Sequence, residues 1–209
     1  TRYLAYAHSD LADSLASLEP DGDSLDDEYL PHLESCLALM QRSAALDPDN
    51  PRGQWDIAFG LTKFGNGLLM ADRLEEAQSQ LARAVPILRA RFVQHPNDSY
   101  AQQNLLEALK LLAITYHRSG MLTQADELFS QADQIASTLD CEKLDNASLA
   151  FLWIEILELW GQLHQSRDLH AAAQETFQKA LDLAHKLQDV SFDLEQSQMW
   201  IDRLNRHLD

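Results

Sequence analysis

Eight histidines and one acid-rich segment are the residues of this chain whose types could support chemistry. The closest histidines in a helical pattern, His164 and His170, are six residues apart, which places them on different faces of a helix. No phosphate-binding glycine loop, no Gly-x-Ser-x-Gly elbow and no His-Glu-x-x-His pair occurs. The sequence therefore predicts no catalytic residue, no metal site and no cofactor, and we interpret His164 as a packed, hydrogen-bonded core residue.

The acid-rich segment, residues 19–28, raises the question of calcium binding. If Asp21 opened an EF-hand loop, the glycine required at the sixth place would be Asp26 and the glutamate required at the twelfth would be His32. The pattern fails at both places. A solvated loop whose acids favour the start of the next helix explains the charges, and weak cation binding is the alternative.

The chain is strongly acidic, with 33 acidic and 16 basic residues and a net charge of −17. Nucleic acids and anionic membranes bind clustered Lys and Arg, so we expect neither as a partner. A basic or mixed-charge protein would be attracted to such a chain. Acidic outer faces that keep a repeat protein soluble would give the same composition, so the charge alone does not establish a partner.

The elements that position these residues follow from a self-similarity at a spacing of 48 residues. The first copy comprises Leu61, Phe64, Gly65, Leu68, Ala77, Leu81 and Ala84. Adding 48 gives Leu109, Leu112, Ala113, Tyr116, Ala125, Phe129 and Ala132, and a second step gives Leu157, Trp160, Gly161, His164, Ala173, Phe177 and Ala180. Intervals of three and four place each set on one stripe of two successive helices. Each copy is therefore predicted to be a helical hairpin, with small residues where the two helices approach closely.

Helix boundaries agree with the period. Asn50, Asp98 and Asn146 are equivalent residues of types that cap helix N-termini, and they predict first helices of the hairpins over 51–70, 99–118 and 147–166. Second helices are expected over 73–94, 122–139 and 169–187, where Asp72 with Glu75 suggests a capping box. Asn97 and Asn146 also begin glycosylation triplets, but capping explains these residue types.

The seven-residue pattern resembles the tetratricopeptide repeat, whose usual period is about 34 residues. The repeats here are longer by two heptads, which corresponds to about two extra turns, roughly 10 Å, in each helix. The resemblance implies an all-α, right-handed α-solenoid of about four hairpins with a C-terminal capping helix, about nine helices in all. We expect one domain over 1–209, with repeats near 2–47, 50–95, 98–140 and 146–188 and the capping helix near 192–208.

In tetratricopeptide domains, the first helices of the hairpins line a concave groove that binds a peptide. Carried over position by position, the resemblance assigns to this groove Tyr6, Phe59, Asn66, Met70, Lys110, Ile114, His117, Arg118, Glu155, Glu158 and Gln162. Such a groove would be apolar at one end, basic at its centre and acidic at the other end. Lys110 and Arg118 would bind a carboxylate or phosphate, while an ordinary solvated face is the alternative for these charges.

These features indicate a non-enzymatic scaffold that binds a protein or peptide partner in the groove. By resemblance, it would be the recognition or regulatory region of a larger, bacterial signalling protein. A ligand- or peptide-sensing regulatory domain and a self-association module are the alternatives, so a homo-oligomer stays open.

Two cysteines, Cys36 and Cys141, lie in different repeats and are expected to be reduced. The longest apolar run, 149–154, is far shorter than the roughly 20 residues of a membrane span. Both observations suit the cytoplasm, which we predict as the compartment.

Overall fold

The computed structural model describes residues 2–18, 29–139, 147–190 and 193–208. Over these residues, the chain forms nine α-helices and no strand, which confirms the all-α prediction. The chain divides into two compact units, Thr1–Pro96 and Asn97–Asp209. The division falls between the predicted second and third repeats, and the single domain stays a prediction.

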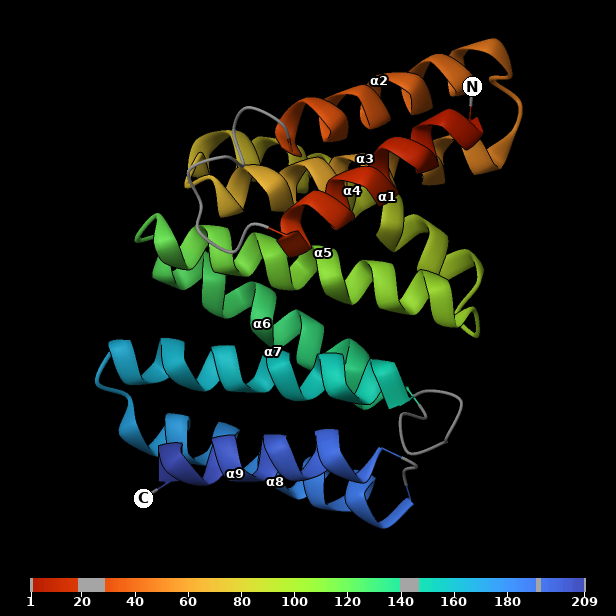
Figure 1. Ribbon diagram of the computed structural model, residues 1–209. Coiled ribbons are helices and arrows are strands. Elements are labelled where there is room, and N and C mark those ends of the chain that lie inside the picture. Colours follow the sequence, from red (N-terminus) through yellow and green to blue (C-terminus); the bar gives the residue numbers. More distant parts are fainter. Residues whose placement is uncertain (1, 19–28, 140–146, 191–192, 209) are drawn as a thin grey trace. The chain divides into compact units, whose positions relative to one another are not determined.

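The first unit consists of two helical hairpins (Figure 1). Its helices are α1 (Arg2–Leu18), α2 (Leu30–Leu46), α3 (Pro51–Met70) and α4 (Leu74–Gln94). Each helix packs on the next one in chain order, as expected of stacked helical repeats.

The second unit consists of two hairpins and a final helix. Its helices are α5 (Ser99–Arg118), α6 (Leu122–Ser137), α7 (Ala147–Ser166), α8 (His170–Val190) and α9 (Leu194–Leu208). Consecutive helices pack together, and α7 also contacts α5. The predicted capping helix is confirmed as α9, which packs on α8 and buries Trp200, Ile201 and Leu204.

Helix starts follow the caps that the sequence predicts. α3, α5 and α7 begin and end at the expected residues, and the second helices agree to within a few residues. The Asn50 side chain accepts a hydrogen bond of 3.1 Å from the backbone N–H of Arg52. Asp98 likewise accepts from the backbone N–H of Tyr100 at 2.9 Å and of Ala101 at 3.3 Å. Asn146 lies outside the described residues.

The turns inside three hairpins share a left-handed residue. Asp72, Gly120 and Asp168 occupy equivalent positions, with φ of +58°, +75° and +57°. Asp and Gly tolerate this region better than most residues, which explains their presence. The predicted capping box is wrong at Asp72, because α4 begins after Arg73 and its N-cap makes no side-chain hydrogen bond to the helix.

Inside the hairpins, the small residues face large ones. A Cβ added at Gly65 would lie 2.6 Å from Leu81 Cγ, and one added at Gly161 would lie 2.5 Å from Phe177 Cε1. These contacts join equivalent positions of two repeats, so the predicted close approach of paired helices is confirmed. Leu81, Phe129 and Phe177 are all buried at the centres of their hairpins.

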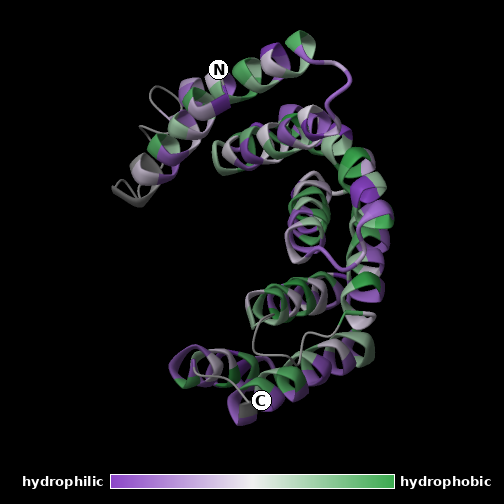
Figure 2. Cartoon of the chain, turned by 90° about the vertical axis from the view of Figure 1, so that its right-hand side faces the viewer, coloured by the Kyte–Doolittle hydropathy of each residue, from purple (hydrophilic) through white to green (hydrophobic). Residues whose placement is uncertain are grey.

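Hydrophilic and hydrophobic residues share each helix (Figure 2), as stacked amphipathic helices require. Of the helices described, none combines the length and the apolar character needed to cross a membrane. Cys36 is a buried free thiol. Cys141 and the acid-rich segment 19–28 lie outside the described residues.

Candidate functional site

In the first unit, two of the predicted groove residues are held against each other. The rings of Tyr6 on α1 and Phe59 on α3 are tilted, with centroids 5.7 Å apart. The Tyr6 hydroxyl donates to Oδ1 of Asp56 at 3.1 Å, and Arg2 Nε donates to Oδ2 of the same carboxylate at 2.7 Å. Asp56 is only 5% exposed, so its charge is compensated from within the unit. Tyr6 and Phe59 therefore contribute to the packing of α1 on α3.

The other two predicted residues of this unit retain accessible surface. Met70 is 45% exposed at the end of α3, where its sulfur lies 4.0 Å from the Tyr29 hydroxyl. Asn66 is half-buried one turn earlier. A neighbouring lysine on the same helix, Lys63, pairs with Asp13 of α1 at 2.8 Å. The first unit thus offers Met70 and Asn66 for contact with a partner, beside an ion pair between α1 and α3.

In the second unit, Lys110 is enclosed by two carboxylates. Its side chain is 9% exposed, and Nζ lies 2.9 Å from Glu107 Oε2 on the same helix and 3.0 Å from Glu155 Oε2 on α7. Burial lowers the pKa of Lys110, but the two glutamates outweigh burial and leave the pKa raised. The predicted basic centre is therefore wrong, because two partly exposed glutamates surround one buried ammonium group.

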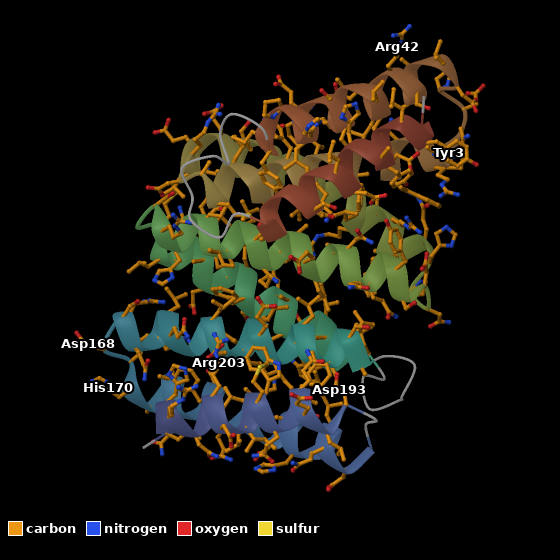
Figure 3. The ribbon with its side chains drawn as sticks, in the orientation of Figure 1. Tyr3, Arg42, Asp168, His170, Asp193 and Arg203 are labelled. Carbon is orange, nitrogen blue, oxygen red and sulfur yellow. The ribbon has the colours of Figure 1, made fainter. Side chains whose placement is uncertain are left out.

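Glu158 is the clearest departure from the predicted groove. It is fully buried, and Oε1 accepts hydrogen bonds from Arg203 Nε at 2.6 Å and from His207 Nε2 at 3.0 Å. Both donors belong to α9, and Figure 3 shows Arg203 between this helix and α7. His207 also stacks on Phe177, with ring centroids 4.5 Å apart. The expectation that Glu158 faces a ligand is wrong, because α9 covers it.

A mixed-charge stripe remains along α5 and α7. It comprises Glu107, Ile114, His117, Arg118, Glu155 and Gln162, which we call the acidic-to-basic stripe. The side chains of Glu107 and Glu155 are 36% and 39% exposed. Ile114, His117 and Gln162 are half-buried, and Arg118 is exposed. Glu107 and Arg118 are 11 residues apart on α5, or about 16 Å.

A polar cluster between α6, α7 and α8 was not foreseen. Asp126 Oδ1 accepts from the Trp160 indole N–H at 2.7 Å and lies 3.2 Å from His164 Nε2. The carboxylate fixes a proton on Nε2, and Nδ1 lies 3.3 Å from the Thr176 hydroxyl. The interpretation of His164 as a buried, hydrogen-bonded residue is confirmed. Trp160 could have signalled the cluster, because a buried indole N–H needs an acceptor.

Burial of Asp126 raises its pKa, but hydrogen bonds from Trp160 and His164, together with the charges of His164 and Arg167, outweigh this effect and lower the pKa. The cluster is therefore a structural tie between three helices. Within the described part of the chain, no group of three His, Cys, Asp or Glu side chains could hold a metal ion.

Comparisons with known proteins identify a fold and no family. No family model matches the chain, and no curated protein matches it. BtubC (BKLC) from P. vanneervenii is similar over 99% of this chain and 89% of its own, at 14% sequence identity and a TM-score of 0.51. This likeness shows a shared helical fold alone.

Two further solved structures were matched with lower scores. "MamA RS-1 ArsTM double mutant" is 17% identical, with a TM-score of 0.36, and the match covers 87% of this chain and 97% of that one. "DHF79 filament" is 14% identical, with a TM-score of 0.44 and coverages of 98% and 96%.

Proposed function

We propose that this chain is a tetratricopeptide-like scaffold that binds an extended segment of a partner protein. The repeat pattern supports this class, because its seven positions form the close-packed hairpins described above. The acidic-to-basic stripe is the observation that carries the proposal. It is a surface of first helices that holds an apolar side chain, Ile114, between carboxylates and an arginine.

The order of charges along the stripe defines the partner. Glu107 and Glu155 keep exposed oxygens after pairing with Lys110, so they attract a Lys or Arg. Ile114 lies one turn further along α5 and would contact an apolar side chain. Arg118, one more turn along, would pair with an Asp or Glu. An extended strand rises about 3.3 Å per residue, so about five residues span the stripe.

Peptide display tests this proposal. Random 12-residue peptides are selected on the whole chain, and enriched peptides are measured by isothermal titration calorimetry. We expect a basic residue, an apolar residue and an acidic residue in that order. Ile114→Arg should weaken binding at least tenfold, which is about 1.4 kcal/mol, because it removes the apolar contact and adds charge beside Arg118.

Ser130→Arg is the matched control, because it introduces the same side chain at an exposed position on α6 of the same unit. Its affinity should equal that of the wild type. Thermal melts of both variants report on folding. Equal affinities for both variants, or enriched peptides without this charge order, would place partner binding elsewhere.

Self-association is the second candidate, and one observation favours it. α1 exposes three large hydrophobic side chains, Tyr3 at 90%, Leu4 at 54% and Leu11 at 45% (Figure 3). Light scattering over a range of concentrations, on the wild type and on Leu4→Glu, tests this candidate. A constant monomeric mass for both proteins would refute it.

A further inference from the structure

A cavity of about 430 Å³ lies in the first unit between the first turns of α3 and the C-terminal half of α4. It is lined by Pro51, Gln54, Trp55, Pro86, Ile87, Ala90, Arg91 and Gln94. None of these residues belongs to the predicted groove, and none has a role in the function proposed above. The cavity combines apolar walls with amide and guanidinium donors, which is the composition of a peptide-binding pocket.

The centre of the pocket is a stacked pair. The Arg91 guanidinium carbon lies 4.0 Å from the centroid of the Trp55 ring. The His95 ring packs edge-on against the same indole, with centroids 5.5 Å apart. Stacking on an indole orients a guanidinium, whose five N–H donors suit a carboxylate better than any other side chain does. The pair therefore places a positive charge beside an apolar wall.

The charge around this pocket is opposite to that of the chain. No residue of the lining is acidic, and no Asp or Glu occurs from Ala77 to Asn97. The same stretch contains Arg83, Arg89 and Arg91. In a chain with a net charge of −17, this is a local basic surface, and an acidic ligand would meet the least repulsion there.

Hairpin packing does not require the stacked pair. The positions one period later hold Gln103 and Leu139 in place of Trp55 and Arg91. A glutamine and a leucine cannot form a cation–π pair, although the third hairpin folds in the same way. The Trp55 and Arg91 pair is thus a local property of the second hairpin.

We propose that this pocket binds an acidic peptide segment through one apolar or aromatic anchor. The anchor enters between Trp55, Pro86 and Ile87, and a neighbouring carboxylate of the peptide accepts hydrogen bonds from Arg91. The amides of Gln54 and Gln94 bond to the peptide backbone. The site differs from the acidic-to-basic stripe in position and in the charge that it selects.

A synthetic peptide series tests the proposal by fluorescence anisotropy on the whole chain. Each eight-residue, fluorescein-labelled peptide carries one anchor, which is Leu, Phe, Trp or Pro, flanked by Asp and Glu. One control series replaces the anchor by Ala, and another replaces the acids by Lys. At least one acidic, anchored peptide should bind at least tenfold more tightly than both of its controls, a difference of about 1.4 kcal/mol.

Variants locate the binding. Arg91→Gln keeps a long polar side chain but removes the charge, and it should weaken the best peptide at least tenfold, as should Trp55→Ala. Arg83→Gln makes the same change on an exposed arginine of α4 outside the pocket, where Nη1 donates to Gln80, and it should leave affinity within about twofold. Ile114→Arg should also have no effect, which separates this site from the proposed function.

A thermal melt shows whether each variant is folded, and Ile87→Glu supplies a second probe if Arg91→Gln unfolds. The proposal is overturned if no acidic, anchored peptide binds above its controls. Preference for the lysine series would also overturn it, as would equal affinities of the wild type, Arg91→Gln, Trp55→Ala and Ile87→Glu proteins.

Discussion

Glu158 and Arg203 form the charge-reversed counterpart of Lys110 and Glu155 one repeat earlier. Arg203 Nε donates to Glu158 Oε1 at 2.6 Å, and Lys110 Nζ donates to Glu155 Oε2 at 3.0 Å. Glu158 lies 48 residues after Lys110, and Arg203 lies 48 residues after Glu155. In register, α9 therefore takes the place relative to α7 that α7 takes relative to α5. The final helix continues the stack of first helices, and an ion pair sets each step within this unit.

The first prediction tests this symmetry with a double-mutant cycle. Glu158→Lys and Arg203→Glu each place two like charges together at a buried site, so each should lower the free energy of unfolding by about 3–5 kcal/mol. The double variant restores an opposite pair with the polarity of Lys110 and Glu155. It should be more stable than the sum of the single changes by about 1–3 kcal/mol.

Urea denaturation gives the unfolding free energies, and hydrogen exchange of residues 194–208 reports on α9 directly. Asp202→Lys serves as control, because this residue is exposed on the same helix. Strict additivity of the two single changes would show that Glu158 and Arg203 are not coupled.

The second prediction concerns the contact between α7 and α8. Gly161→Ala would place a methyl group 2.5 Å from Phe177 Cε1, so the ring or the backbone must move. Overpacking of this kind should cost about 1–3 kcal/mol. Gln165→Ala, exposed on the same helix, should stay within about 0.5 kcal/mol of the wild type. Equal melting temperatures for both variants would contradict the close approach.

The sequence predicted the helices well because their signals are local. Asn50 and Asp98 cap the helices that they were expected to cap, and Asp72, Gly120 and Asp168 mark the turns. Gly65 and Gly161 sit opposite large side chains, as the alternation of small and large residues predicted. All these features depend on residues within one hairpin.

The candidate site was predicted less well because exposure depends on distant residues. Lys110 and Glu155 are 45 residues apart, as are Glu158 and Arg203. The period places these residues on the first helices, but it does not show which charges face each other across neighbouring helices. Only the register of α9 shows that Glu158 is covered. The Trp55 pocket was missed because its two walls come from opposite ends of a hairpin.

The third prediction is a pH dependence at Asp126. Its pKa in the folded chain lies below the unfolded value of about 3.9. The carboxylate therefore stabilises the fold fully above the unfolded pKa, and this contribution is lost as the pH falls through the folded pKa. Asp126→Asn should lower the free energy of unfolding by about 1–2 kcal/mol at pH 7.

Urea titrations of both proteins between pH 7 and pH 2.5 measure this difference. It should shrink as the carboxyl group is protonated, because the wild type then loses the same charge. A difference that stays constant over the whole range would assign the effect to packing against Trp160 and His164 rather than to the ionised carboxylate.

The fourth prediction concerns the thiol of Cys36. Burial raises its pKa to about 11; Lys63 opposes this effect, and Asp13 and Asp10 add to it. Because the thiolate is the reactive form, alkylation by iodoacetamide at pH 8 should be roughly 100-fold slower in the native chain than in urea. The Cys141→Ser variant isolates the signal of Cys36. Equal rates in the two states would show that the thiol is neither buried nor shifted in pKa.

The last prediction separates stability from binding at the stripe. Lys110→Met removes the charge between Glu107 and Glu155 and leaves two carboxylates facing each other, so it should cost about 1–3 kcal/mol. Added salt should recover part of this loss by screening the repulsion. Arg118→Met, the same change at an exposed site, should stay within about 0.5 kcal/mol.

Urea denaturation at low and high salt compares the two variants. If they were equally stable, the carboxylate cage around Lys110 would contribute nothing in solution. If Lys110→Met is the less stable, reversing the charge of Lys110 alters the fold as well as the surface. Binding experiments on the stripe should therefore use Ile114→Arg and Arg118→Met, whose side chains are not part of the cage.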